Sequence, residues 1–583
     1  MQLFIIVLLS LLGNTHIFAK SYSYKMKKRP SLNSAFIKLQ QLVTLDKKDL
    51  STVYFFAILG GIISLTLPLG IQTILTFVMA ATFSTSIAIL ILLVLIGVFL
   101  NGLVQVRQMQ AIERIRQKIF TRYSLEMSHK IPNLDLEKLD NYYLPQMVNY
   151  FFDVTSLTKS MEKILLDIPA AIIQIFLGLL LLSFYHPIFI AFGLAVVAVL
   201  FIILKYTSRR GFETNMEASD YKYKIAGWLQ EVAHLVKSFK YSRDNEIHMT
   251  RSNSLVSGYL VSRTNHFKVL VFQYWSFISF KILIVASMLL VGSYLLIEQQ
   301  INLGQFIASD IVIILIISSV EKLITGVDKV YDSLTSIEKL SKVIDSENEE
   351  GGSVLLQTAK GVAVDFSNVN YTYPDGSKAL ENVNLKIKPG KIIGITAPSG
   401  SGRSTLIRLL TGAFKGYTGM ISINEIPVSN YDVQNLRKHS GILLSQQDIF
   451  NGTILENITM GNTNISMQEI TSLATKTGFT GFVNSNKKGF DLLLDPFGKK
   501  LNNHIRRNIL LMRALTGKPA LLLLEEPFEH LPIEQQTTMM DYLKNDSNAT
   551  AIILTNNEYI LNRCSSIVKM NTNQTITQVV ENE

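Results

Sequence analysis

The sequence has little charge for its length, and this shortage narrows the class of protein. Charged residues make up 17% of the 583 residues and hydrophobic residues 48%, whereas an average protein has about a quarter charged residues. A disordered chain, or one that is wholly soluble, would carry more charge. The length and composition together predict about two or three domains, some of them strongly apolar.

Cysteine is almost absent as well. The chain has one cysteine, Cys564, so it cannot form an internal disulfide or a metal site built from several thiolates. This excludes a small scaffold held together by disulfides. A reducing compartment suits such a chain.

The most informative absence is a long run without charge. No Asp, Glu, Lys, Arg or His occurs from Ser51 to Val106. About 56 residues would extend roughly 84 Å as a helix, whereas the hydrocarbon core of a membrane is about 30 Å thick. We therefore expect two membrane spans with a turn near Phe77 to Ser84, rather than buried helices of a soluble core. Four further spans are predicted from the apolar runs at about 164–184, 187–205, 267–296 and 303–325.

Lys281 and Asp310 fall inside two of these apolar runs. Ionisable residues within spans normally face a bundle interior or a water-filled path rather than lipid. We expect these two residues to form pairs rather than to line a path.

The connections between the spans differ in basic charge. Lys and Arg are frequent in 20–48, 107–122 and 205–240, whereas 77–84, 185–187 and 298–304 contain none. Because basic loops stay in the cytoplasm, six spans with both ends in the cytoplasm fit the pattern. This places the protein in the cytoplasmic (inner) membrane, in contact with the lipid bilayer. It also accounts for the net charge of +10, so we do not expect nucleic acid as a partner. The long basic connections 107–163 and 206–266 are expected to be helices that continue beyond the membrane.

The first 48 residues form a separate segment. Met1–Phe18 is near signal-peptide length but lacks a basic start, and Met26 is an alternative translation start. A basic elbow would then lead to a six-span domain over 49–344 and an acidic linker over 345–360.

The remaining residues, 361–583, have the pattern of an α/β domain. Short β-rich runs alternate there with helical stretches. The runs are Ala363–Phe366, Lys391–Thr396, Ser440–Leu444, Ala520–Leu524 and Ala551–Thr555.

A glycine-rich turn after the second run predicts a phosphate-binding loop. The segment Ala397–Thr405 reads APSGSGRST and has the strand–loop–helix context of a P-loop. Its glycines let backbone amides close around phosphate oxygens, and the helix N-terminus adds partial positive charge. Ala397 replaces the usual first glycine, and Arg403 replaces lysine with a bulkier, planar cation. The phosphate-contacting residues are expected to be Ser399, Gly400, Ser401, Gly402, Arg403, Ser404 and Thr405, with Ser404 also a ligand of Mg²⁺.

A second motif, Leu521–Pro527, reads LLLLEEP and predicts a buried strand that carries two acids at its C-terminal end. In the order and spacing of these motifs, and in the six spans before them, residues 30–583 resemble the ABC transporters of exporter type. The resemblance implies an all-α six-helix transmembrane domain followed by an α/β P-loop NTPase domain. It also implies ATP and Mg²⁺ as ligands, and a half-transporter that forms a homodimer or a heterodimer.

The resemblance assigns roles to further residues. Tyr373 matches the aromatic residue that stacks on adenine, Glu525 the Walker B acid and Glu526 the general base. Either Gln446 or Gln447 matches the Q-loop glutamine, and the spacing leaves both open. The implied Mg²⁺ ligands are Ser404, Gln446 and Glu525. Segments around Leu136–Pro145 and Ser219–Glu231 match the cytoplasmic coupling helices of the family, which touch the nucleotide-binding domain.

Several positions depart from the family pattern. The signature LSGGQ falls on Leu501–Ile505, which reads LNNHI, so Asn502, Asn503 and His504 would face ATP bound to the opposite subunit. Glu525 replaces an aspartate, Pro532 replaces the D-loop aspartate, and Asn556 replaces the switch histidine. We therefore expect a transporter subunit that couples ATP binding, with slow hydrolysis, to export. The alternative is a catalytically weak pseudo-ATPase with a regulatory or scaffolding role.

Overall fold

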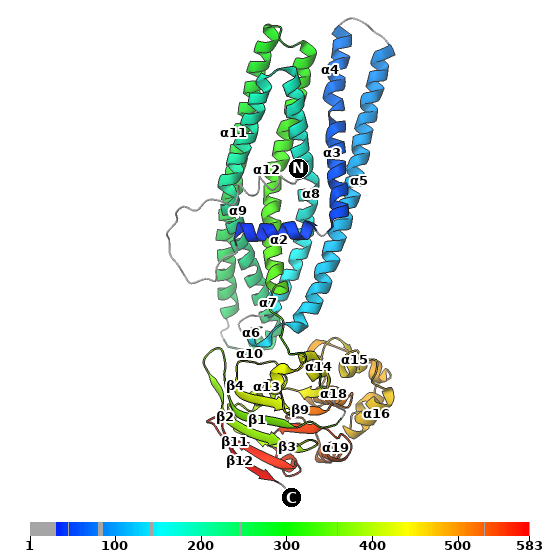
Figure 1. The fold of residues 1–583 in the computed structure, drawn as a ribbon, viewed down its shortest axis with the longest axis vertical. Coiled ribbons are helices and arrows are strands. Elements are labelled where there is room, and N and C mark those ends of the chain that lie inside the picture. The colour runs from blue at the N-terminus through cyan, green and yellow to red at the C-terminus, as the bar shows by residue number, and fades with distance from the viewer. Residues whose placement is uncertain are drawn as a thin grey trace. The chain divides into compact units, whose positions relative to one another are not determined.

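The computed structural model describes residues 31–581, apart from 45, 80–84, 140–143, 244–245, 358–359 and 530. The chain divides into two compact units (Figure 1). The helical unit comprises residues up to Asn133 and Asn141–Ser346, and the α/β unit comprises Leu134–Asp140 and Glu347–Glu583. The signal-like stretch Met1–Phe18 and the alternative start at Met26 lie outside the described residues.

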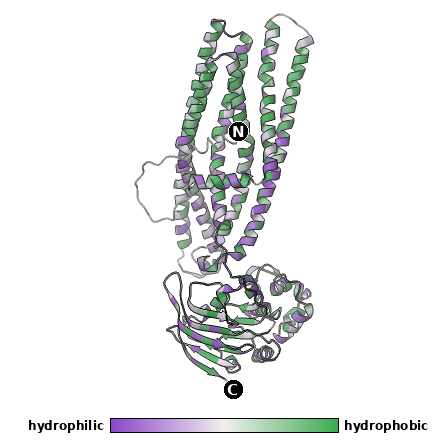
Figure 2. Ribbon diagram, in the orientation of Figure 1, coloured by the Kyte–Doolittle hydropathy of each residue, from purple (hydrophilic) through white to green (hydrophobic). Residues whose placement is uncertain are grey.

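Six candidate membrane spans are found among the described residues, as predicted. Figure 2 shows hydrophobic residues along one end of these long helices and hydrophilic residues gathered toward the other. Helix α4 ends at Met79 and α5 begins at Thr85, and residues 80–84 of the turn expected near Phe77 to Ser84 lie outside the described residues. The spans are formed by α3 (Lys47–Ser64) with α4 (Thr66–Met79), α5 (Thr85–Lys130), α8 (Phe152–Tyr185), α9 (Ile188–His234), α11 (Ile247–Ile297) and α12 (Leu303–Ile344).

The long helices extend beyond their apolar stretches. Helix α5 has 46 residues, or about 69 Å, more than twice the thickness of a hydrocarbon core. The basic connections are therefore helical over most of their length, as expected. Shorter elements join the long helices: α2 (Leu32–Thr44), η1 (Ile131–Asn133), α7 (Leu144–Val148), η2 (Asn149–Phe151) and α10 (Val236–Tyr241).

Helix α12 is the most buried of these helices, with half of its most apolar stretch covered. It packs along α8 and also contacts α4, α9 and α11. Close approach to α9 depends on a glycine, because a Cβ on Gly211 would lie 2.4 Å from the ring of Tyr331.

One expectation for the helical unit, that Lys281 and Asp310 form pairs, is wrong. Lys281 is exposed on α11 and Asp310 is half-buried on α12, and neither forms an ion pair within the described part of the chain. The segment Ser219–Glu231, which the resemblance matches to a coupling helix, lies inside the continuous helix α9. The chain reverses direction only after His234, where the short helix α10 follows.

The α/β unit is built around a six-stranded sheet in the order β12-β11-β3-β10-β9-β6. All neighbouring strands pair in parallel except β12, which is antiparallel to β11. Every residue of β9 and β10 is buried, as expected for central strands covered on both faces. The strands are β3 (Ile392–Thr396), β6 (Ser440–Leu443), β9 (Leu521–Glu525), β10 (Thr550–Leu554), β11 (Ser566–Met570) and β12 (Ile576–Glu581).

A second, antiparallel sheet has the order β2-β1-β4-β5. The five predicted β-runs are confirmed within one or two residues at their starts, but β1 continues well past its predicted end, and β2, β4, β5, β7, β8, β11 and β12 were not predicted. The strands of this sheet and of a small third one are β1 (Val364–Thr372), β2 (Lys378–Ile387), β4 (Thr418–Ile423), β5 (Ile426–Pro427), β7 (Gly452–Thr453) and β8 (Leu493–Leu494).

Helices surround these sheets, and together they give the α/β fold that the sequence predicts. They are α13 (Arg403–Leu410), α14 (Val433–Lys438), α15 (Ile454–Thr459), α16 (Met467–Lys476), α17 (Thr480–Asn484), α18 (Asn503–Leu515), α19 (Ile533–Asn545) and α20 (Glu558–Leu561), with the short turns η3 (Val428–Asn430), η4 (Gly489–Asp491) and η5 (Pro496–Gly498).

The short helix α6 (Leu136–Leu139) belongs to the α/β unit, although it follows α5 in sequence. The Glu137 carboxylate accepts hydrogen bonds from the Tyr371 hydroxyl, at 3.3 Å, and from the Lys415 amide, at 3.2 Å. Leu134 is buried and pairs with Asn348 in an isolated bridge. The chain therefore passes between the two units at three points.

Candidate nucleotide-binding site

The parallel sheet of the α/β unit brings the ends of three strands together. Ile395 of β3 pairs with Leu554 of β10, which pairs with Glu525 of β9. The residues that follow these strands therefore meet at one edge of the sheet. In open α/β folds this carboxyl edge is where ligands bind.

The loop Ala397–Thr405 turns from β3 into α13 at this edge. Gly402 precedes the helix with a φ of +83°, and a Cβ there would lie 1.8 Å from the carbonyl oxygen of Ala379. Glycine is therefore required at this position for two reasons. The first amides of α13 have no acceptor within their own helix, so they can bind an anion.

Arg403, the first residue of α13, joins two of the expected site residues. Its Nη2 donates to Glu526 Oε1 at 3.2 Å, and its Nη1 donates to Asn556 Oδ1 at 3.0 Å. The Asn556 oxygen also accepts from the Thr396 hydroxyl at 3.0 Å and from the Ala397 amide at 3.3 Å. The arginine thus contacts the expected general base and the switch position at once.

Ser404 and Glu525 form a pair of oxygen donors beside this cluster. The Ser404 hydroxyl donates to Glu525 Oε1 at 2.6 Å, and the Ser445 amide donates to Glu525 Oε2 at 2.8 Å. Burial acts to raise the pKa of Glu525, but these hydrogen bonds outweigh it and hold the pKa below its usual value. The carboxylate is therefore charged at neutral pH.

Arg507, on α18, holds the backbone that carries both acids. Its Nη2 donates to the carbonyl of Glu526 at 2.9 Å and also to that of Glu525. Glu526 has a φ of +43°, a left-handed conformation that few residues with a side chain adopt. The two hydrogen bonds stabilise this turn and so fix the direction of the Glu526 carboxylate.

Tyr373 and the two glutamines occupy the surroundings of the site. The Tyr373 hydroxyl lies 2.7 Å from Thr405 Oγ1 on α13, which ties the aromatic ring to the helix after the phosphate loop. The Gln447 side chain accepts from the Leu444 amide at 3.4 Å and so turns back on its own loop. Gln446 is exposed.

The signature residues start helix α18. Asn502 caps the helix by accepting from the Ile505 amide at 2.8 Å, and Asn503 accepts from Arg506 at 3.3 Å. His504 Nε2 is buried and has no hydrogen-bond partner among the described residues. The hydrogen bonds described for Asn502 and Asn503 thus stay within their own helix.

Sequence reasoning did not find three residues that contact the acids. The Thr555 hydroxyl donates to Glu526 Oε2 at 2.7 Å, and Arg507 and Ser445 bind as described above. Thr555 is the last residue of the predicted run Ala551–Thr555 and directly follows the observed strand β10, which is a usable signal. Arg507 lies one helical turn after the signature, but nothing in the sequence indicates which loop it would reach.

In the part of the chain that the structure describes, no group of three or more His, Cys, Asp or Glu side chains could hold a metal ion. A metal at this edge would depend on hydroxyl and carboxylate oxygens together with a ligand's own oxygens. Ser404 and Glu525 supply oxygen donors of the kind that Mg²⁺ prefers.

Comparison with known proteins agrees with this geometry. Residues 380–529 match the family described as ABC transporter. The chain is 30% identical over 282 residues to the alpha-hemolysin translocation ATP-binding protein HlyB of Escherichia coli O157:H7. It is 26% identical over 284 residues to the cyclolysin secretion/processing ATP-binding protein CyaB of Bordetella pertussis. Each match covers 48% of this chain and 40% of the relative, so the matched region spans less than half of either relative.

A solved structure resembles nearly the whole chain. It is the structure of a bacterial Atm1-family ABC exporter with ATP bound, with a TM-score of 0.84 and 16% sequence identity. The match covers 92% of this chain and 96% of that one, so the apolar helices and the α/β unit both share its fold. The α/β unit thus contains a region that matches the ABC transporter family, and the chain as a whole shares the fold of a solved ABC exporter, with six candidate membrane spans followed by the matched region.

Proposed function

We propose that this chain is one half of an ATP-driven exporter. The observation that carries the proposal is the joined set of contacts Arg403–Glu526, Arg403–Asn556 and Ser404–Glu525 at the carboxyl edge of the sheet. The names of the relatives, which describe translocation and secretion, support export over a regulatory or scaffolding role. The basic connections support a cytoplasmic membrane location with the α/β unit in the cytoplasm.

ATP would bind with its phosphates over the loop Ala397–Thr405 and its adenine near Tyr373. The first amides of α13 and the Arg403 guanidinium would neutralise phosphate charge. Ser404 and Glu525 would hold Mg²⁺, which neutralises charge on the phosphates when it is bound. Gln446 is the better third ligand, because the Gln447 side chain is already bonded to Leu444.

A second subunit is required to complete the site in this proposal. Asn502, Asn503 and His504 would face the nucleotide of that subunit, which is either a second copy of this chain or a related half-transporter. His504 places a ring where the family has glycine, so close backbone approach to a phosphate is hindered.

Hydrolysis is proposed to be slow. Glu526 is the candidate general base, yet its carboxylate is bonded to Arg403 and Thr555. Asn556 stands where a proton-carrying histidine is expected, and an amide cannot carry that proton. Loss of one positioned acid or base costs about 10² to 10⁴ in rate.

The proposal is tested on the full chain in lipid nanodiscs, alone and with any half-transporter that co-purifies. We expect MgATP to bind, and hydrolysis to be slow and to disappear in Glu526→Gln, while Glu558→Gln, an exposed acid at the start of α20, leaves it unchanged. ATP-dependent export of a cargo would further support the proposal. Failure to bind MgATP would refute the proposal, and binding without any turnover or transport would favour the pseudo-ATPase alternative.

A further inference from the structure

The helical unit contains a polar cavity of about 510 Å³. Helices α8, α9, α11 and α12 supply its wall, so it lies within the bundle of one chain. Pockets for small ligands commonly have volumes of about 300 to 1,000 Å³. The cavity is therefore large enough for a small ligand.

The wall of the cavity is positively charged. Five basic side chains line it, against the three acids Asp153, Glu162 and Asp332. Each acid is already engaged: Asp153 with Lys222 at 3.1 Å, Glu162 with Arg116 at 3.0 Å, and Asp332 with Lys329 at 2.9 Å. Within the described residues, the remaining three basic side chains, Lys159, Lys163 and Arg263, have no ion pair.

Two buried polar atoms on the same wall lack partners. Asp153 Oδ2 and Ser219 Oγ have no hydrogen-bond partner in the part of the chain that is described, and their residues are only 2% and 9% exposed. Buried polar atoms are nearly always bonded to protein, water or ligand. These two atoms can accept from, or donate to, a molecule that enters the cavity.

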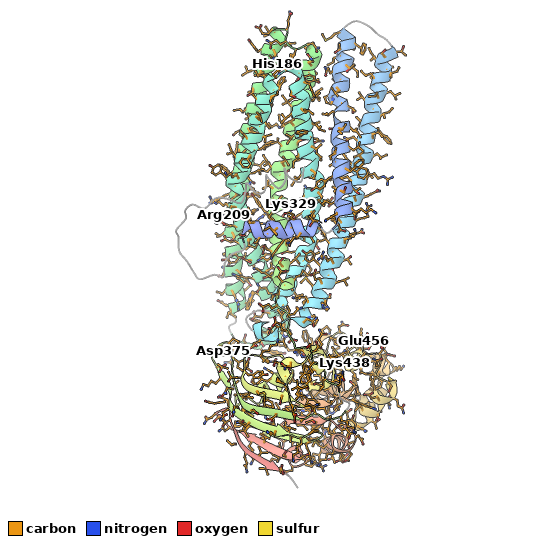
Figure 3. The ribbon with its side chains drawn as sticks, viewed as in Figure 1. His186, Arg209, Lys329, Asp375, Lys438 and Glu456 are labelled. Carbon is orange, nitrogen blue, oxygen red and sulfur yellow. The ribbon has the colours of Figure 1, made fainter. Side chains whose placement is uncertain are left out.

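The cavity begins where the apolar spans end. Lys163 directly precedes the apolar run 164–184, Arg263 lies four residues before 267–296, and Lys329 lies four residues after 303–325. At 1.5 Å per residue these charges lie within about 6 Å of the apolar boundary. Figure 3 shows Lys329 on α12 near the height at which α2 crosses the long helices.

We propose that this cavity binds an anion of phosphate or carboxylate chemistry that also carries a hydroxyl or amine donor. The unpaired Lys159, Lys163 and Arg263 would bind its negative oxygens through charge-assisted hydrogen bonds. Asp153 Oδ2 would accept from its donor, and the Ser219 hydroxyl would supply a further bond. A lipid head group at the membrane boundary and a soluble anionic cargo both have this chemistry. The site goes beyond the proposed ATP-driven export, and it does not depend on ATP turnover.

The test measures binding to the full chain in phosphatidylcholine nanodiscs without ATP. Citrate represents a soluble anion with a hydroxyl, and its binding is measured by calorimetric titration. Phosphatidylglycerol represents a lipid head group, and the molecules bound are counted by native mass spectrometry of the detergent-solubilised chain. The variant K163Q/R263Q removes one lysine and one arginine from the cavity. The control R210Q/K268Q removes the same two residue types from exposed positions on α9 and α11 that do not line it.

At least one probe should bind the wild type and the control equally well, and K163Q/R263Q at least tenfold more weakly. The variant S219A keeps every charge and adds no atoms to the cavity, and it should also weaken the binding of that probe. It therefore tests the site even where the double variant folds poorly. Loss of citrate binding identifies a soluble anion, and loss of phosphatidylglycerol alone identifies a head group. The proposal is overturned if neither probe binds the wild type, or if K163Q/R263Q and the control behave alike. MgATP binding and turnover are measured separately, so failure here leaves the export proposal standing.

Discussion

In the candidate nucleotide site, the Arg403 side chain contacts both Glu526 and Asn556. A lysine at this position would be a compact charge without the planar fork that bonds two partners. The arginine therefore holds the candidate base in an ion pair. ATP would have to compete for the same guanidinium.

The variant R403K/N556H is expected to hydrolyse ATP at least tenfold faster than the wild type. Lysine frees the Glu526 carboxylate from its ion pair, and histidine restores a group that can carry a proton. Phosphate release by the full chain in nanodiscs measures the rate. The triple variant R403K/N556H/E526Q should fall back to background, and an unchanged rate in the double variant would mean that other departures limit turnover.

The lowered pKa of Glu525 makes part of the stability depend on pH. A carboxyl group with a folded-state pKa below its usual value of 4.5 stabilises the fold above that pH, and the contribution is lost as the pH falls through the folded-state pKa. Thermal unfolding of the wild type should therefore lose more stability than that of E525Q between neutral pH and about pH 3. Equal losses would show that the Ser404 and Ser445 hydrogen bonds do not shift this pKa.

At the scale of elements, the phosphate loop depends on backbone geometry that side chains cannot replace. Gly402 has a φ of +83°, and a Cβ at this position would clash with the carbonyl oxygen of Ala379. Gly517, between α18 and β9, has nearly the same φ of +82° but open space around a Cβ. Substituting each glycine by alanine therefore distinguishes the cost of the left-handed backbone, which both positions share, from the cost of a steric clash, which only Gly402 has.

We expect G402A to abolish MgATP binding and G517A to preserve it. Both substitutions should cost about 1 kcal/mol for the left-handed backbone, and G402A should cost more because its Cβ meets the Ala379 carbonyl. Thermal unfolding and equilibrium binding of a fluorescent ATP analogue measure the two effects. Equal loss of binding in both variants would contradict the role of the Ala379 contact.

The sequence predicted elements with a strong burial pattern and missed those without one. The charge-free run and the strands at 521–525 and 550–554 are buried or apolar throughout, so they stand out. Strand β12 has no fully buried residue, which leaves no alternation to detect. At the site, Ser404 and Glu525 could be predicted because each lies in a recognisable sequence motif. The contacts of Arg507 depend on how helix α18 packs against the turn after β9, 18 residues further along the chain, which no local pattern encodes.

At the scale of the whole molecule, the chain passes between its two units at three points, because α6 belongs to the α/β unit. The Glu137 contacts with Tyr371 and Lys415, and the bridge from Leu134 to Asn348, hold this segment in place. The resemblance implied a coupling helix at Leu136–Pro145 that touches the α/β domain while belonging to the six-span domain 49–344.

Removing the Glu137 carboxylate should loosen this segment. E137A removes the carboxylate that accepts from the Tyr371 hydroxyl and the Lys415 amide, and we expect a loss of about 1 to 3 kcal/mol in the stability of the α/β unit. Hydrogen exchange at 134–140 and 415–417 measures the local effect. E126A, which removes an exposed acid from α5, is the control and should leave exchange at these residues unchanged.

Because α6 belongs to the α/β unit, an intact acidic linker is not needed to keep the two parts of the chain associated. If a protease site placed between residues 357 and 361 were cut, the fragment that carries the helical unit would still contact the α/β unit through residues 134–140, and also through the Glu349–Arg437 ion pair and the Leu356–Asn435 hydrogen bond. The two fragments should then elute together in gel filtration.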